Sequence, residues 1–256
     1  MLIAISADSS VPRAKIQRLI ETTGLSPCGD EQTDYRLHLS DTRLELHMHG
    51  MQPLYVDFTA SKARHRRLHG GGKGQMLARA AGLRKHQKPE VIDATAGLGC
   101  DAFVLATLGA NVTLLERSPI AHALLADGLR RARNEPEIAT IASRMRLIHS
   151  DADDWLRVEQ PRPDAIYLDP MFPTSGKTAQ VKKEMQCFHA LIGRDDDASR
   201  LLETARRLAT RRVFVKRPRH AEALGGQTAA FSLRGKSTRF DVYLPTNPSA
   251  LDSSIP

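Results

Sequence analysis

One stretch near the middle of the chain constrains the fold more than any other. Residues 89–106 read PEVIDATAGLGCDAFVLA, where a short apolar run ends in Asp93, passes through Gly97 and Gly99, and opens into a second apolar run. This order predicts a strand, a tight turn and a helix that begins near Asp101. Glycine suits the turn because it tolerates positive φ and leaves room for a ligand beside the backbone.

The acids around this turn bear on which ligand it binds. A second predicted strand, residues 111–115, ends in Glu116, whose carboxylate can accept hydrogen bonds from both hydroxyls of a ribose. A dinucleotide would place its pyrophosphate where Asp101 stands, and Asp93 adds another acid. Two carboxylates suit the ammonium of an amino-acid moiety better, which favours S-adenosylmethionine over a nicotinamide cofactor. Glycines that serve packing alone are the remaining alternative.

Strands and helices alternate from this stretch to about residue 245. Ser118 and Pro119 form a helix-start signal, because serine can cap a helix and proline fits its first position. Further strands are predicted at 145–151, 165–169 and 212–216, and a terminal hairpin at 230–233 and 240–244. We therefore expect an α/β, Rossmann-like fold with a mostly parallel seven-stranded sheet and an antiparallel terminal strand.

Four of the predicted strands end in an acid: Asp93, Glu116, Asp151 and Asp169. The carboxyl ends of parallel strands lie at one edge of a sheet, and ligands bind outside that edge. The four carboxylates are therefore predicted to converge on one site.

The fourth of these strands runs into a turn that suits amine methylation, Asp169-Pro170-Met171-Phe172-Pro173. The exocyclic amine of a base is a poor nucleophile, because its lone pair is delocalised into the ring. Asp169 and the Pro170 carbonyl could accept its two N–H groups, and Phe172 could stack on an extruded base. The alternative is an ordinary strand-ending turn, which is a common use of Asp-Pro.

Composition and charge narrow the class of protein. The 256 residues include 37 Lys and Arg against 29 Asp and Glu, a formal charge of +8, which favours a polyanionic partner. Three scattered cysteines give no disulfide framework, and the histidines show no metal-binding spacing, so we expect no metal. The chain has neither a long apolar stretch nor a signal-peptide pattern, so a cytoplasmic location and no membrane partner are expected.

Two basic segments are candidates for contact with a nucleic acid. Residues 61–75 hold five cations and four glycines, which predicts either a solvated face or a segment that follows an RNA backbone. The second segment ends the strand at 212–216. The candidate RNA-binding residues are Lys62, Arg64, His65, Arg66, Arg67 and Lys73 in the first segment, and Lys216 and Arg217 in the second.

Domain boundaries follow from changes in pattern. We expect a small α+β extension at 1–59, a basic linker with a helix at 60–88, the cofactor-binding domain at 89–245 and a flexible tail at 246–256. Within the extension and linker, the patterns predict strands at 2–7 and 54–58, a helix after Pro12, a hairpin formed by 35–39 and 44–48, and a helix over 75–85.

Several of these motifs together resemble one family, the RsmJ-type ribosomal RNA guanine-N2 methyltransferases of bacteria. The resemblance covers residues 54–244. Its motifs are residues 93–99, 115–117, 167–173, 181–185 and 215–218, together with 63–67 and 70–72. It implies a class I methyltransferase fold, S-adenosylmethionine as methyl donor and methylation of one guanine N2 in 16S ribosomal RNA, with the small ribosomal subunit as partner.

The resemblance also implies where the cofactor is held. The contacts would be Cys100 and Asp101, Glu116 and Arg117, Asp151 and Ala152, and Asp169. Cys100 stands where the family carries arginine, so the contact implied there is one of the backbone. Three rival functions stay open: methylation of an adenine or cytosine amine, nicotinamide oxidoreduction, and RNA binding without catalysis.

Overall fold

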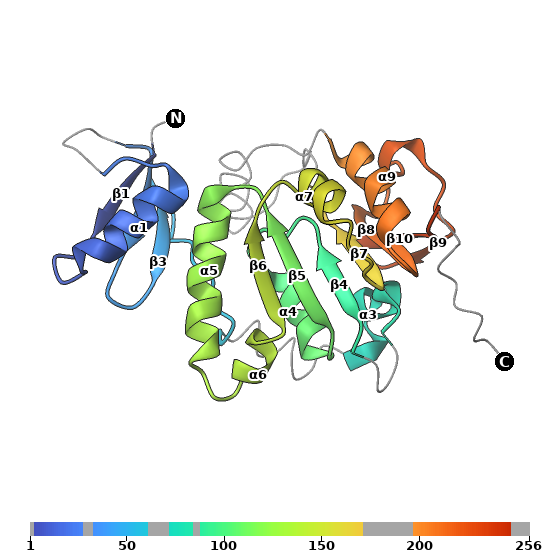
Figure 1. The fold of residues 1–256 in the computed structure, drawn as a ribbon, viewed down its shortest axis with the longest axis horizontal. Helices are drawn as coiled ribbons and strands as arrows, with labels where there is room; N and C mark the ends of the chain where they lie inside the picture. Colours follow the sequence, from blue (N-terminus) through green and yellow to red (C-terminus); the bar gives the residue numbers. More distant parts are fainter. Residues whose placement is uncertain (1–2, 28–32, 61–71, 84–87, 171–196, 247–256) are drawn as a thin grey trace.

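The computed structural model describes residues 3–27, 33–60, 72–83, 88–170 and 197–246, and its centre is a seven-stranded sheet (Figure 1). The strand order is β6-β5-β4-β7-β8-β10-β9. The strands are β4 (Glu90–Asp93), β5 (Asn111–Glu116), β6 (Met145–His149), β7 (Ala165–Leu168), β8 (Arg212–Pro218), β9 (Phe231–Arg234) and β10 (Thr238–Tyr243). β4 to β8 are parallel, and β10 runs antiparallel to both β8 and β9. This confirms the predicted sheet with its antiparallel terminal strand.

Helices cover both faces of the sheet. On one face lie α3 (Met76–Ala81), α4 (Cys100–Thr107), α5 (Pro119–Arg133) and the short α6 (Ala139–Ala142). On the other lie α7 (Ala152–Glu159) and α9 (Ala198–Leu208). Neighbouring residues of β4 enter different cores, Val91 the first and Ile92 the second. Strands buried on both faces carry continuous apolar runs, which is why these segments lack polar alternation.

The sheet has a topological switch point beside β4. The chain passes from β4 to β5 and β6 on one side, then crosses to β7 and β8 on the other. In open α/β sheets, the loops diverge there and leave a crevice outside the carboxyl ends. Asp93, Glu116 and Asp169 lie at that edge, as expected.

The N-terminal part forms a separate three-stranded sheet. It consists of β1 (Ile3–Ala7), α1 (Arg13–Thr23), β2 (Tyr35–Leu39) and β3 (Leu44–Met48). β1 pairs with β2 in parallel, and β2 with β3 as the predicted hairpin. This sheet lies beside α5, near the β6 edge of the central sheet (Figure 1).

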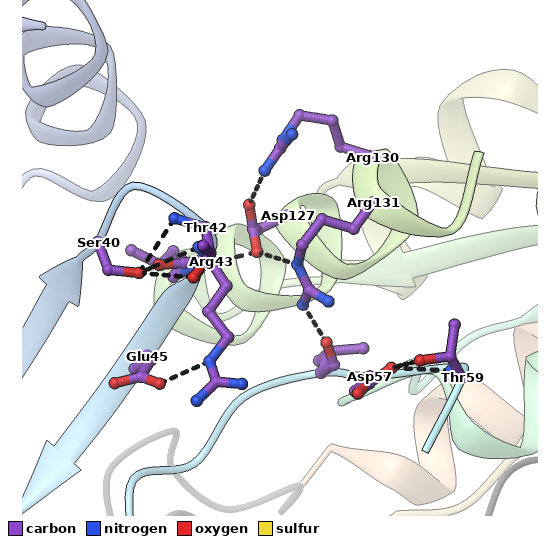
Figure 2. A network of polar contacts seen from close by, with 11 residues as sticks. Ser40, Thr42, Arg43, Glu45, Asp57, Thr59, Asp127, Arg130 and Arg131 are labelled. Carbon is purple, nitrogen blue, oxygen red and sulfur yellow. Dashed lines mark hydrogen bonds and ion pairs between the residues drawn. The ribbon is translucent and has the colours of Figure 1, made fainter. Parts of the chain in front are cut away.

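Asp127 of α5 joins the two sheets (Figure 2). Its Oδ2 accepts the Leu44 N–H at 3.1 Å and Arg131 Nε at 2.9 Å, while its Oδ1 accepts Arg130 Nη2 at 2.7 Å. Arg131 also donates to the carbonyl of Val56, in the segment that links the sheets. The N-terminal sheet is therefore tied to α5 by bonds in which backbone groups take part.

One predicted element of this region is wrong, and another is confirmed but shorter than expected. Residues 54–58 form no strand beyond an isolated bridge between Leu54 and Leu46. Val56 packs closely on Gly128 of α5, and Phe58 stacks on Phe103 of α4 with ring centroids 4.6 Å apart, so the segment follows helices instead of a strand. The helix predicted over 75–85 ends at Ala81, because Gly82 takes a left-handed conformation that closes it.

The short 3-10 turns are η1 (Gly72–Gly74) and η2 (Leu224–Gly226). Within the described residues, no helix is both long and apolar enough to cross a bilayer.

Candidate functional site

The β4–α4 loop is built on two glycines in left-handed conformations. Gly97 has φ 53° and Gly99 has φ 74°, as predicted for the turn. A Cβ on Gly99 would lie 2.7 Å from Leu125 Cδ1, so packing as well as φ requires glycine there. A Cβ on Gly97 would meet nothing within 4 Å, which leaves open space on that side of the loop.

Hydrogen bonds fasten this loop to the strands on either side of β4. The Ala94 N–H donates to the carbonyl of Tyr167 at 2.9 Å, and the Ala96 N–H donates to that of Leu115 at 3.1 Å. The Thr95 hydroxyl accepts the Asp169 N–H at 2.7 Å. The loop is thus held to both β5 and β7, and its position relative to Asp169 is fixed by Thr95.

A cavity of about 330 Å³ lies over this edge of the sheet. Its volume is within the range of small-molecule sites, about 300–1,000 Å³. Seven carboxylates and two cations line it: Asp93, Asp101, Glu116, Asp151, Asp153, Asp169 and Asp197, with Arg117 and Lys216. So acidic a lining suits a ligand with positive charge and opposes a pyrophosphate. S-adenosylmethionine, with its sulfonium and ammonium, fits this lining.

Lys216 of β8 is the cation at the inner side of the cavity. Its Nζ lies 2.7 Å from Asp169 Oδ2 and 3.0 Å from Asp101 Oδ2. Asp101 Oδ2 also accepts the Tyr167 hydroxyl at 2.7 Å. Burial acts to lower the pKa of Lys216, but the two carboxylates outweigh it and raise the pKa above its usual value. Lys216 therefore stays charged and joins the end of β7 to the first turn of α4.

Asp93 is the most buried of the acids, with 2% of its surface exposed. Burial raises its pKa to about 8; the carboxylates of Asp101, Asp169 and Glu116 add to this, against the hydrogen bond it accepts from the Thr95 N–H. Near neutral pH, Asp93 is therefore mostly protonated when no cation lies beside it. A cationic group entering the cavity would favour its ionised form.

Glu116 connects the glycine loop to the start of α5. Its Oε2 accepts the Gly97 N–H and its Oε1 the Ser118 N–H, each at 2.7 Å. The carboxylate is buried, yet it lines the cavity. Two backbone donors fix its orientation toward whatever binds there. Ser118 caps α5 as predicted, by accepting the Ala121 N–H.

Arg117 and Asp151 form the far wall of the cavity. Arg117 Nη1 lies 3.2 Å from Asp197 Oδ1 and 3.8 Å from Asp151 Oδ2. Asp151 caps α7 by accepting the N–H groups of Asp153 and Asp154. The arginine therefore bridges the acid that starts α7 and the one that precedes α9.

The structure brings most of the predicted site residues together. The cavity is lined by Asp93, Gly97, Cys100, Asp101, Glu116, Arg117, Asp151, Ala152, Asp169 and Pro170. Gly99 is not among its lining residues and packs beneath the loop on Leu125. Phe172 lies outside the described residues, as do Lys62, Arg64, His65, Arg66 and Arg67. Lys73 lies in η1.

Two of the expected RNA-binding residues, Lys216 and Arg217, lie at the end of β8. Lys216 points into the cavity, where it pairs with two carboxylates. Arg217 is 6% exposed and donates Nε and Nη2 to the carbonyl of Glu222 at 3.0 and 2.6 Å. Successive side chains of a strand point to opposite faces, so Lys216 lines the cavity while Arg217 is buried on the other face.

Sequence reasoning missed three residues of this site. Thr95 accepts the Asp169 N–H, Tyr167 donates to Asp101, and Asp197 pairs with Arg117. Tyr167 carried a signal, because it lies two residues before Asp169 in an apolar run and its hydroxyl needs a partner when buried. Asp197 carried no such signal in the sequence, because its ion pair with Arg117 depends on how α9 packs against the end of β5. Among the described residues, no group of three or more His, Cys, Asp or Glu side chains could hold a metal ion.

Comparison with known proteins places this site in context. A family model described as a putative SAM-dependent methyltransferase matches residues 18–245. Proteins named ribosomal RNA small subunit methyltransferase J are similar to the chain. The protein of Pseudomonas paraeruginosa is 47% identical to this chain, and the match covers 92% of this chain and 96% of the relative. The protein of Laribacter hongkongensis is 56% identical, and the match covers 76% of this chain and 70% of the relative.

A solved structure matches the whole fold. The crystal structure of a SAM-dependent methyltransferase from Neisseria gonorrhoeae superposes with a TM-score of 0.77 at 39% identity, and covers 98% of this chain and 100% of its own. The fold is therefore that of a SAM-dependent methyltransferase, and S-adenosylmethionine is the cofactor of the family.

Proposed function

The chain belongs to the ribosomal RNA small subunit methyltransferase J family of SAM-dependent methyltransferases, and we propose that it methylates the exocyclic N2 of a guanine in 16S ribosomal RNA. One observation carries the choice of an amine acceptor. Asp169 and Pro170 follow β7 directly and line the wall of the acidic cavity, so a carboxylate and a backbone carbonyl would stand beside the cofactor. The partner follows from the proposal: ribosomal RNA, free or in the small subunit, in the cytoplasm.

The cofactor-binding roles are proposed from the cavity lining. Asp93 and Asp101 would hold the ammonium end, and Glu116 the ribose hydroxyls. The loop backbone at Gly97 and Cys100 would lie along the ligand. The wall formed by Arg117, Asp151 and Ala152 would receive the adenine end. This assignment follows the order of the strands, since Asp93 ends the central β4 and Asp151 follows the edge strand β6.

The acceptor side is proposed to depend on Asp169. When bound, S-adenosylmethionine supplies an electrophilic methyl group. The Asp169 carboxylate and the Pro170 carbonyl would accept the two N–H groups of the guanine amine and orient its lone pair. Asp169 would also take the proton that the amine loses as it is methylated. Phe172 would stack on the base. Positioning of this kind supplies much of the rate of a displacement reaction.

Lys216 supports this role of Asp169 electrostatically. Its Nζ, 2.7 Å away, favours the ionised carboxylate, which is the form that accepts hydrogen bonds. Thr95 fixes the backbone of Asp169 from the other side. The acceptor carboxylate is therefore held by contacts to both β8 and the glycine loop.

The test uses small ribosomal subunits from a strain that lacks this protein. Purified protein is incubated with these subunits and labelled S-adenosylmethionine, and the RNA is digested to nucleosides for mass identification. We expect N2-methylguanosine in 16S ribosomal RNA. A methylated adenine or cytosine would refute the proposed acceptor, and cofactor binding without transfer to any base would refute the proposed substrate.

A matched pair of variants tests the role of Asp169. Asp169→Asn should lower kcat on the order of 10²-fold, while Asp154→Asn, an exposed acid on α7, should leave it unchanged. Full activity of Asp169→Asn with normal cofactor binding would rule out the acceptor role.

A further inference from the structure

The strands β8, β9 and β10 lie side by side at one end of the sheet (Figure 1), and three cations lie close together in the chain just beyond β8 and in the β9–β10 turn. They are Arg219, Arg234 and Lys236, called the basic rim below, and all three are exposed. Arg219 follows the last residue of β8, while Arg234 and Lys236 flank Gly235 in the β9–β10 turn.

The basic rim lies at the same edge of the sheet as the cavity. β10 runs antiparallel to β8, and its first residue, Thr238, pairs with Pro218. The β9–β10 turn is therefore at the carboxyl end of β8, where Lys216 enters the cavity. Arg219 comes three residues after Lys216, which spans about 10 Å of extended chain.

The backbone that carries the basic rim is tightly fixed. The Arg219 N–H donates to the carbonyl of Ser237 at 3.0 Å, and Arg219 Nη1 donates to that of Gly235 at 3.3 Å. Beneath them, the buried Arg239 donates Nη1 to three carbonyls, those of Pro218, Arg219 and Ala221, at 3.3, 2.9 and 2.6 Å. The turn and the loop therefore form one preorganised surface.

Arg239 is held in place by Asp241. Its Nε lies 2.9 Å from Asp241 Oδ1 and its Nη2 lies 2.9 Å from Asp241 Oδ2, in a bidentate pair. The charge of this buried arginine is therefore neutralised within the protein. The charges available to a ligand are those of the exposed rim.

The charges of the basic rim are not balanced by acids. Some exposed arginines have carboxylate partners, as Arg130 has Asp127 and Arg157 has Asp153. In the described part of the chain, no ion pair involves Arg219, Arg234 or Lys236. A cation without an acid partner breaks no ion pair when it binds phosphate. Its binding also releases the counterions condensed on the nucleic acid.

We propose that the basic rim binds the phosphate backbone of the RNA strand that carries the target base. The inference rests on the proposed function, because it assigns the substrate a path over the edge next to Asp169. Contacts of this kind set the register of the strand and carry no sequence information. RNA binding at this end of β8 would then depend on residues just beyond Lys216 and Arg217.

The test compares two charge reversals of equal size. Arg234→Glu with Lys236→Glu changes the basic rim and spares Arg219, which bonds to the backbone. The control, Lys88→Glu with Arg162→Glu, places the same charge change on exposed residues before β4 and β7, at the opposite edge of the sheet. Affinity for small-subunit RNA is measured from about 50 to 200 mM salt, together with the affinity for S-adenosylmethionine.

We expect the rim variant to bind RNA at least 10-fold more weakly at low salt, with the slope of log affinity against log salt lower by roughly two. Its affinity for S-adenosylmethionine should be unchanged, which also shows that the variant is folded. The control variant should match the wild type. Equal RNA affinity and salt slope in both variants would overturn the proposal.

Failure of the proposed function would look different. In that case the wild-type protein would form no N2-methylguanosine on the subunits. The binding measurement needs no turnover, so it still decides whether the basic rim contacts RNA.

Discussion

Replacement of Lys216 by methionine removes one charge from the centre of the site and keeps most of the side chain's bulk. Two carboxylates, Asp101 and Asp169, lose the cation that lies 3.0 and 2.7 Å from them. Removing one partner of a fully buried ion pair costs about 3–5 kcal/mol. The side chains of Lys216 and Asp169 are 30% and 36% exposed, so solvent screening reduces this to about 2–3 kcal/mol. The corresponding fall in Tm is roughly 4–12 °C for a chain of this size.

Replacement of Lys216 should affect methyl transfer to the RNA amine and binding of S-adenosylmethionine differently. With Lys216 gone, Asp101 and Asp169 repel each other, so the pKa of at least one of them rises. A protonated Asp169 is a poorer acceptor for the amine, so we expect kcat to fall about 10²-fold, most strongly at low pH. The cofactor is cationic, and the more negative cavity should bind it at least as tightly as before. Lower kcat with undiminished cofactor affinity is therefore the expected combination.

The pH dependence follows from the signs of the shifts. The pKa of Lys216 is raised in the folded protein, so its stabilising effect is fully present below the usual lysine pKa and is lost as the pH rises from there through the raised value. Between pH 6 and 9 the wild type should therefore keep a charged Lys216 beside Asp169. In Lys216→Met, the acidic limb of the rate profile should move to higher pH, and Lys216→Arg should restore it.

The assay combines methyl transfer at saturating subunits from pH 6 to 9, calorimetric titration with S-adenosylmethionine, and thermal unfolding. A purely structural role for Lys216 predicts that kcat and cofactor affinity fall together, with no shift of the pH profile. That outcome would refute the electrostatic role assigned to Lys216.

Two further predictions concern β4 and the loop after it. Asp93 is protonated in the folded state up to a pKa of about 8 but ionised when unfolded, so the free energy of unfolding should fall with rising pH by about 1.4 kcal/mol per unit between pH 5 and 7. Asp93→Asn should abolish this contribution in denaturant titrations at pH 5, 6 and 7, and equal slopes in both proteins would contradict the buried neutral form. Gly99→Ala should lower stability by about 2–3 kcal/mol, because the new Cβ meets Leu125 and φ is positive. Gly97→Ala should lower stability by about 1 kcal/mol, because only the positive φ opposes the new side chain there. Equal losses of stability in Gly99→Ala and Gly97→Ala would refute the packing argument.

The sheet and its functional edge were predictable from local patterns. Each core strand is a short apolar run, and an acid follows directly where the chain leaves the sheet, as at Asp93 and Glu116. Parallel strands bring such ends together without any knowledge of distant contacts. Ser118 likewise capped its helix as its position before a proline predicts.

The surroundings of other residues depend on contacts between segments far apart in the chain. Val56 and Phe58 follow the surfaces of α5 and α4, although their alternation is typical of a strand. Arg217 and Lys216 are consecutive cations, and no local pattern says that one would pair with carboxylates and the other with a backbone carbonyl. Tertiary packing decides such cases, because propensity alone is weak.

Although the chain has a net charge of +8, the cavity and the basic rim carry charges of opposite sign. The cavity holds seven carboxylates against two cations, which suits a positively charged cofactor, while the basic rim a few residues away carries three exposed cations that form no ion pair with the described residues. Lys216 stands between them and pairs with acids on the cavity side. If the proposed RNA contact at the rim holds, the polyanion would be drawn to the rim and repelled by the cavity, so the uncharged base extruded from the strand would be the part that approaches Asp169. On this reasoning, the charge pattern itself directs the base, and not the phosphate, toward the methyl group.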